Sequence, residues 1–188
     1  MRCFLTTSSV SLAAIALFAA GPASASSNLL DNPTFQNNGA GWTVMYAQSG
    51  SDFNFSGVLA NFGSVGAYDD VISQTLATTP GQLYTISFNL IHYYSDVAND
   101  FSASFGGNTI YSLTNAGYFN TTLVTETAAA TSTSTVLAFA GREVPNWYSL
   151  SNPSVSAVPD PIAGAGLPAV LGLLGLAFLY RRQRLHSI

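Results

Sequence analysis

Hydrophobic and polar residues alternate most clearly over residues 82–90 of the chain. Successive side chains of an extended strand point to opposite faces, so a period of two predicts a β-strand with one buried face. Pro80 and Gly81, directly before this stretch, are a turn signal. One face of the predicted strand carries Tyr84, Ile86, Phe88 and Leu90, and the other carries Leu83, Thr85, Ser87 and Asn89.

The same pattern predicts eight further strands, over residues 42–46, 58–62, 71–76, 101–105, 109–113, 119–127, 136–141 and 148–156. Gly106 and Gly107 separate two of them and predict a hairpin. Pro153 has no backbone N–H to donate, which indicates that the last strand lies at a sheet edge or is bulged. The polar residues 131–135 are interpreted as the approach to the strand that follows rather than as a linker.

Short strands separated by Gly, Pro and Asn turns, with no 3.6-residue period, favour an all-β sandwich. Residues 26–157 form this predicted ectodomain, and 132 residues are enough to bury a core. The linker behind it is expected at residues 154–161, where two prolines favour an extended backbone.

The first 25 residues are typical of a signal peptide. Arg2 gives a positive start, residues 10–20 are apolar, and Ala23 and Ala25 form a small-x-small cleavage site. Cys3 lies before the apolar stretch, so it is not a lipoprotein acceptor. We therefore expect export by the general route, with cleavage after Ala25.

The other end of the chain, residues 158–188, carries a second apolar segment. Residues 162–180 are 19 uncharged positions, nearly enough for a helix to cross the roughly 30 Å hydrocarbon core of a membrane. Arg181 and Arg182 follow and are expected to stay on the cytoplasmic side. This basic end (181–188) and the apolar run predict one C-terminal transmembrane helix.

Charge excludes some classes of partner. Charged residues make up 7% of the chain, against about 25% in ordinary soluble proteins. Residues 26–157 hold eight acidic residues and a single base, Arg142, which we expect to form a local ion pair. Nucleic acid is not an expected partner, because phosphate binding needs clustered Lys and Arg. Cys3 is the single cysteine, so the domain is expected to contain no disulfide and no thiolate chemistry.

The order of these segments resembles the PEP-CTERM proteins of Gram-negative bacteria. The sorting motif would be Val158, Pro159, Asp160 and Pro161, followed by the apolar helix and the arginines. Asp160 stands where the family usually has Glu, which keeps the carboxylate and shortens it by one methylene. The resemblance implies an exosortase-type processing enzyme as partner. It also implies transient anchoring in the inner membrane, then delivery to the cell surface or the extracellular matrix.

The ectodomain also resembles known domains. Residues 28–35, 41–42, 72–76, 81–88 and 139–142 resemble PEP-CTERM ectodomains and galactose-binding-like jelly rolls of the carbohydrate-binding-module kind. The resemblance implies a jelly-roll β-sandwich. Related jelly rolls often hold a structural calcium between a Glu in the first strand and an Asp in the last. Gln36 and residues 150–153 offer no such carboxylate, so no metal and no other cofactor is expected.

Catalysis is not expected. His92 is the single histidine before the tail, no Gly-x-Ser-x-Gly elbow accompanies it, and it is interpreted as a half-buried residue at a strand end. Asp69 and Asp70 are adjacent, so on a strand they point to opposite faces rather than across a cleft. A turn with solvated charges accounts for them. Residues 96–100 lack the glycine and the glutamate of an EF-hand loop and are interpreted as a polar loop.

Sugar binding is the chemistry that the aromatic residues favour, because apolar sugar faces stack on aromatic rings. The competing explanation is that half of the candidate aromatic residues belong to the core or are scattered over the surface. Trp42 is expected to belong to the core. The candidate glycan-binding residues are Tyr93, Tyr94, Trp147, Tyr148, Asp69 and Asp70, with Tyr46, Tyr68, His92 and Asn146 as further candidates.

The sequence therefore predicts an exported, non-enzymatic surface or matrix protein that is associated with exopolysaccharide. The alternative is a lectin-like module with a specific glycan pocket formed by loop aromatics.

Overall fold

The computed structural model describes residues 27–47, 51–63, 66–94, 98–143 and 145–159, which belong to one compact unit, Ala25–Pro159. The predicted signal peptide and transmembrane helix lie outside these residues. None of the helices in the described part is long and apolar enough to cross a membrane. The elements of this part are α1 (Gln36–Gly39), β1 (Thr43–Met45), β2 (Asn54–Ser56), β3 (Leu59–Phe62), β4 (Asp70–Ala77), β5 (Leu83–His92), β6 (Asp100–Phe105), β7 (Asn108–Thr114), β8 (Phe119–Ala129), β9 (Ser134–Arg142) and β10 (Tyr148–Ala157).

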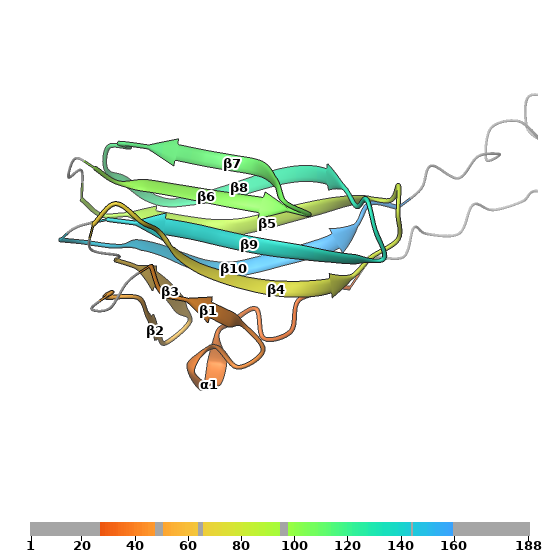
Figure 1. Cartoon of the computed structure of the whole chain (residues 1–188), viewed down its shortest axis with the longest axis horizontal. Coiled ribbons are helices and arrows are strands. Elements are labelled where there is room, and N and C mark those ends of the chain that lie inside the picture. The colour runs from red at the N-terminus through yellow and green to blue at the C-terminus, as the bar shows by residue number, and fades with distance from the viewer. Residues whose placement is uncertain (1–26, 48–50, 64–65, 95–97, 144, 160–188) are drawn as a thin grey trace, which may run out of the picture. The chain divides into compact units, whose positions relative to one another are not determined.

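The described strands form two five-stranded sheets that pack face to face (Figure 1). Sheet A has the order β1-β4-β9-β6-β7, and sheet B has the order β2-β3-β10-β5-β8. All of the pairs are antiparallel. The eight strands from β3 to β10 are divided between the sheets, with the order β3-β10-β5-β8 in sheet B and β4-β9-β6-β7 in sheet A. This is the strand order of an eight-stranded jelly roll. The all-β sandwich predicted from the alternation is confirmed.

The nine predicted strands are all present, with ends that differ by no more than two residues. The hairpin at Gly106 and Gly107 is confirmed, because β6 pairs with β7. Sequence reasoning missed the three-residue strand β2, which is too short to show a period. The four-residue α1 was also missed. It is a local turn, in which Asn37 and Asn38 have left-handed backbone angles that asparagine tolerates better than most residues.

Of two expectations about the last strand, one is confirmed and one is wrong. Pro153 indicates an edge or a bulge, and β10 is bulged between Ser151 and Ser154, while it lies between β3 and β5 in its sheet. The linker does not begin at Ser154, because β10 continues to Ala157. The N–H of Val158 then donates to the carbonyl of Leu83 at 2.9 Å, so pairing with β5 extends beyond the strand.

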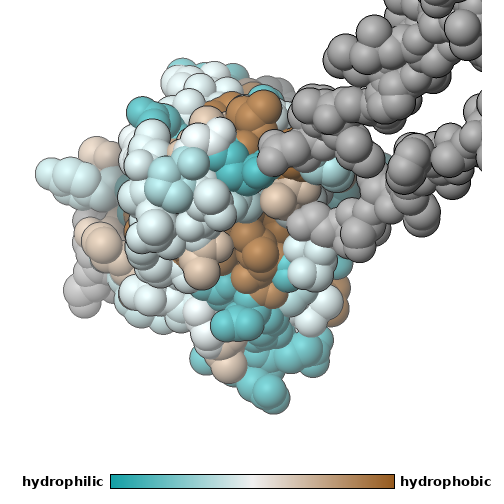
Figure 2. Space-filling view, turned by 90° about the vertical axis from the view of Figure 1, so that its right-hand side faces the viewer, coloured by the Kyte–Doolittle hydropathy of each residue, from teal (hydrophilic) through white to brown (hydrophobic). Residues whose placement is uncertain are grey.

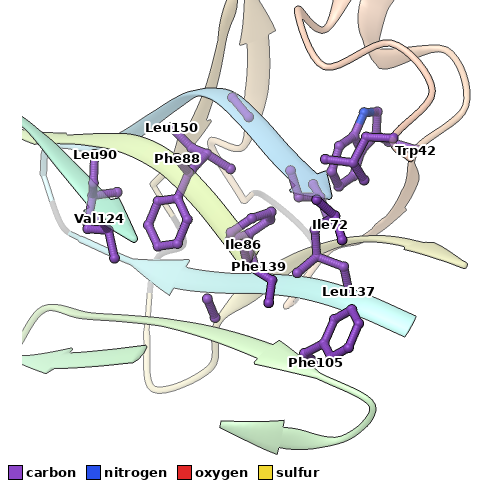
Figure 3. Packing of buried hydrophobic residues seen from close by; sticks show 14 of the residues in the cluster. Trp42, Ile72, Ile86, Phe88, Leu90, Phe105, Val124, Leu137, Phe139 and Leu150 are labelled. Atoms are coloured by element: carbon purple, nitrogen blue, oxygen red, sulfur yellow. The ribbon is translucent and has the colours of Figure 1, made fainter. Parts of the chain in front are cut away.

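The core lies between the two sheets and is rich in aromatic rings (Figure 3). The residues predicted to share the inner face of β5, from Tyr84 to Leu90, are all buried. Phe88 of sheet B meets Phe139 of sheet A edge to face, with ring centroids 5.1 Å apart. Trp42 is buried against this cluster, as expected. With no cysteine in the domain, packing of this kind must stabilise the sandwich.

Candidate functional site

Five connections between the sheets meet at one end of the sandwich, which we call the loop end. They cover residues 46–53, 63–69, 93–99, 115–118 and 143–147. Strand register brings them together, because Tyr148 pairs with both His92 and Phe62, and Arg142 pairs with Asp100. At the opposite end the chain turns at residues 78–82 and 130–133. The last described residues, around Val158, also lie there, against the start of β5.

The exposed aromatic side chains are concentrated at the loop end. Among the described residues, every large aromatic side chain with high exposure belongs to one of the five connections: Tyr46 (58%), Tyr68 (69%), Tyr93 (52%), Tyr94 (54%), Tyr118 (60%) and Trp147 (40%). The exposed large hydrophobic residues in the rest of the described part are not aromatic: Met45, Val58, Leu83, Leu123 and Val136. Figure 2 shows the opposite end, where hydrophobic residues lie between polar ones.

The structure brings some of the predicted glycan-binding residues together and separates others. Tyr93, Tyr94 and Trp147 are exposed at the loop end, as a binding role requires. Tyr118 was missed, although it stands directly before a predicted strand just as Trp147 does. Tyr148 is fully buried, so its inclusion among surface residues is wrong. It lies in the central strand β10, where Ser149 and Ser151 are buried as well.

Trp147 is seated against the backbone of a neighbouring connection. A Cβ atom placed on Gly63 would lie 2.4 Å from Cδ1 of the Trp147 indole, far closer than carbon atoms approach. The indole therefore occupies the space that any side chain at residue 63 would need. At the same end, the rings of Tyr46 and Phe53 meet edge to face at 6.2 Å. At least two of the exposed rings thus rest on fixed neighbours.

A buried histidine–glutamate pair lies beneath these rings. His92 Nε2 and Glu143 Oε1 are 2.7 Å apart, and both side chains are completely inaccessible to solvent. The expectation of a half-buried His92 is therefore wrong. The other ring nitrogen, Nδ1, lies 3.0 Å from the carbonyl of Gly117, which can only accept. Nδ1 is therefore the donor in this contact. The pair joins β5 to the connections 115–118 and 143–147.

Tyr148 and Asn99 continue this polar layer. The Tyr148 ring stacks on His92 with centroids 4.2 Å apart, and its hydroxyl donates to Asn99 Oδ1 at 2.5 Å. Burial raises the pKa of Tyr148, and the nearby Glu143 carboxylate adds to the effect. Asn99 also accepts from the N–H of Ala116 at 3.0 Å and donates to its carbonyl. The buried tyrosine therefore positions the connections that carry the exposed rings.

Asp70 has a similar structural role. Its buried carboxylate accepts from the N–H of Ala47 at 2.9 Å and from the Ser51 hydroxyl at 2.5 Å. The expectation that Asp69 and Asp70 form a solvated turn is wrong for Asp70, because its carboxylate is buried and hydrogen-bonded to the connection 46–53. Asp70 therefore lies beneath the exposed surface of the loop end.

Asp69 is a third exposed and belongs to an ion-pair cluster with Asp100 and Arg142. Arg142 Nε lies 2.8 Å from Asp100 Oδ2 and 3.3 Å from Asp69 Oδ1, which confirms the expected local ion pair. Burial, then the hydrogen bond and the negative charge of Asp100, raise the pKa of Asp69 to about 7. The Arg142 guanidinium also donates to the carbonyl of Gly66 at 3.2 Å.

No group of three or more metal-ligating side chains occurs among the residues that the structure describes. Of the predicted sorting motif, Val158 and Pro159 are described, and the Val158 carbonyl accepts from the Gln82 side chain at 2.6 Å. The other predicted processing residues, Ala23, Ala25, Asp160, Pro161, Arg181 and Arg182, lie outside the described residues.

No family model and no curated protein matches the chain. Several solved structures resemble it, with TM-scores below one half. A carbohydrate-binding module of family 4 has a TM-score of 0.48 and 17% identity over 68% of this chain and 99% of that one. TmCBM61, solved with β-1,4-galactotriose, has a TM-score of 0.46 and 14% identity over 71% of this chain and 100% of that one. The tailspike protein 4 domain of bacteriophage CBA120 has a TM-score of 0.49 and 14% identity over 70% of this chain, which spans 21% of that domain.

Proposed function

We propose that this chain is an exported, non-enzymatic carbohydrate-binding protein that contacts glycan through the aromatic side chains of its loop end. The observation that carries the proposal is the segregation of exposed rings. All six of the highly exposed aromatic side chains in the described part lie on the between-sheet connections. Random surface placement would distribute them over both ends and both sheet faces.

The chemistry of these rings suits sugars. Five of the six are tyrosines, which offer an apolar ring for stacking on sugar C–H groups and a hydroxyl for hydrogen bonding to sugar oxygens. The sixth is Trp147, the largest ring, held against Gly63. Asn146 stands next to it in the sequence and adds an amide. A site of rings with a few polar groups is the usual composition of a sugar-binding surface.

The buried polar layer supports binding by fixing the connections in advance. His92, Tyr148 and Asn99 join the connections 93–99, 115–118 and 143–147, and Asp70 holds the connection 46–53. Loops that are already ordered lose less conformational entropy when a ligand binds. The layer also gives Tyr148 and Asp70, which are expected at the surface from the sequence, a structural role inside the domain.

The finer part of the proposal concerns location. We propose that an exosortase-type system sorts the chain through Val158, Pro159, Asp160 and Pro161, and that the glycan is an exopolysaccharide at the cell surface or in the matrix. The support is the sequence alone: a leader with a small-x-small site, an apolar run of 19 residues and terminal arginines. The membrane contact through residues 162–180 is transient in this proposal.

A glycan array with the purified full chain tests binding. Tyr93→Ala, Tyr94→Ala and Trp147→Ala are each expected to weaken binding about tenfold, since losing one stacked ring costs about 1.4 kcal/mol. Leu83→Ala is the matched control, because Leu83 is 47% exposed at the opposite end of the sandwich. It should leave binding unchanged.

Two results would contradict the proposal. One is the absence of binding to any glycan by a folded wild-type chain. The other is wild-type affinity in all three aromatic variants. That result would favour a surface protein that has no glycan site at its loop end.

A further inference from the structure

The loop end carries most of the negative charge of the domain. Of the seven acidic residues that the structure describes, five lie on the between-sheet connections or on the strand residues next to them. The remaining two, Asp31 and Glu126, lie elsewhere. The five are Asp52, Asp69, Asp70, Asp100 and Glu143.

Most of these carboxylates are already engaged within the protein. Glu143 faces His92, Asp70 accepts from Ala47 and Ser51, and Asp69 and Asp100 face Arg142. Among the described residues, a cationic sugar would therefore meet carboxyl groups that already have partners, apart from the exposed Asp52. The other described carboxylate groups are thus held by partners within the protein, while a single arginine leaves the net charge of the loop end negative.

No positive group remains for an anionic sugar either. Arg142 is the single Lys or Arg between the leader and the tail, and its guanidinium contacts Asp100, Asp69 and the Gly66 carbonyl. His92 is completely buried. The residues of the connections that are not described, 48–50, 64–65, 95–97 and 144, include no base in the sequence. A uronate or sulfate at the loop end would face carboxylates without a counter-charge.

We propose that the glycan bound at the loop end is neutral, and this inference rests on the proposed function. Stacking of sugar C–H groups on tyrosine and tryptophan rings needs no charge on the sugar. Like charges placed close together cost several kcal/mol when water is excluded, and at low ionic strength the repulsion extends to about 30 Å. The loop end therefore accepts uncharged hexose or pentose chains and rejects polyuronates and sulfated polymers.

The test compares matched polymers. The full chain is first screened by affinity electrophoresis against neutral, uronate-containing and amine-containing polysaccharides. The neutral polymer that binds best is then carboxymethylated, or aminated, to the same low degree of substitution. Binding is measured in about 20 mM and about 500 mM salt, where screening lengths differ several-fold.

We expect binding to the neutral polymer to change by less than about twofold between the two salt concentrations. Carboxymethylation should weaken binding on the order of tenfold at low salt, and high salt should restore part of the loss. Trp147→Ala should weaken binding to the neutral polymer about tenfold at both salt concentrations, which assigns the interaction to the loop end.

Each other outcome has one meaning. Preference for a uronate or sulfated polymer would overturn the neutral-ligand inference and leave glycan binding standing. Preference for the aminated polymer would do the same and would indicate that carboxylates of the loop end take part in binding. If no polysaccharide of any charge is retained by the folded chain, the proposed function itself fails.

Discussion

Glycine 63 shows how one missing side chain positions a neighbouring ring. The indole of Trp147 occupies the volume where a Cβ atom at residue 63 would lie. Gly63 is not among the glycines with a positive φ, so its backbone conformation is open to any residue. Glycine is required there because a side chain would have no room. The carbonyl of Asn146 is also close, at 3.2 Å from the same point. The two connections 63–69 and 143–147 therefore depend on this contact.

Gly63→Ala is expected to displace the Trp147 indole while leaving the sandwich folded. The ring would move towards water, so its fluorescence emission should shift to longer wavelength, and glycan affinity should fall by about tenfold. Gly117→Ala is the matched control, since a Cβ there meets nothing within 4 Å. Emission spectra and binding that are the same for the two variants would contradict the seat that we assign to Trp147.

At the scale of strands, the ion-pair cluster joins three strand ends. Asp69 directly precedes β4, Asp100 begins β6 and Arg142 ends β9. The raised pKa of Asp69, about 7 against an ordinary 3.8, means that the folded protein binds more protons than the unfolded chain between about pH 4 and pH 7. Stability is therefore expected to decrease as the pH rises through this range.

The substitution Asp69→Asn removes the titrating carboxyl group and keeps a side chain of nearly the same size. We expect the free energy of unfolding to fall less steeply between pH 4 and pH 7 in the variant than in the wild type. The difference should be on the order of 1 kcal/mol, because Asp69 is partly exposed and solvent screens it. Urea unfolding at pH 4, 5, 6, 7 and 8 measures it. Parallel pH profiles for the two proteins would show that Asp69 does not titrate in this window.

The strands could be predicted from sequence because alternation is a local signal. Residues 82–90 show it within one segment, and in the structure the strand runs from Leu83 to His92. The polar layer could not be predicted in the same way. Glu143 follows His92 by about fifty residues and Ser51 precedes Asp70 by 19, so the pattern around each residue says nothing of its partner. A sequence pattern therefore places a polar residue near a turn at or near the surface, and the expectations for Tyr148, Asp70 and His92 are wrong for this reason.

Candidate ring residues were easier to identify than their role. Tyr93, Tyr94 and Trp147 stand next to predicted strand ends, where the side chain leaves the sheet. Tyr148 is one residue further along and is the first residue of β10. This strand pairs with β3 on one side and with β5 on the other, and its first four residues are buried. A sequence shows where a strand begins, but it does not show which strand becomes central in its sheet.

At the scale of the whole molecule, the proposed sorting through the C-terminal segment can be tested directly. We expect mass spectrometry of the protein from surface and matrix fractions to find a C-terminus near Pro159, and the inner-membrane fraction to contain the uncut chain. Asp160→Ala should increase the uncut form, because the motif would lose its carboxylate. An intact tail in every fraction would contradict processing by an exosortase-type enzyme and leave the glycan site unaffected.

The described chain starts and finishes at the end of the sandwich away from the tyrosines. The N–H of Leu29 donates to the Val155 carbonyl, and that of Val158 donates to the Leu83 carbonyl, so both chain ends are fastened near the first residues of β5. A fluorescent label, a fusion partner or a solid support joined directly to the described domain at Ser27 or Pro159 is consequently attached at the end of the sandwich away from the rings. Immobilised copies would present their tyrosines to the solution without any redesign of the attachment point.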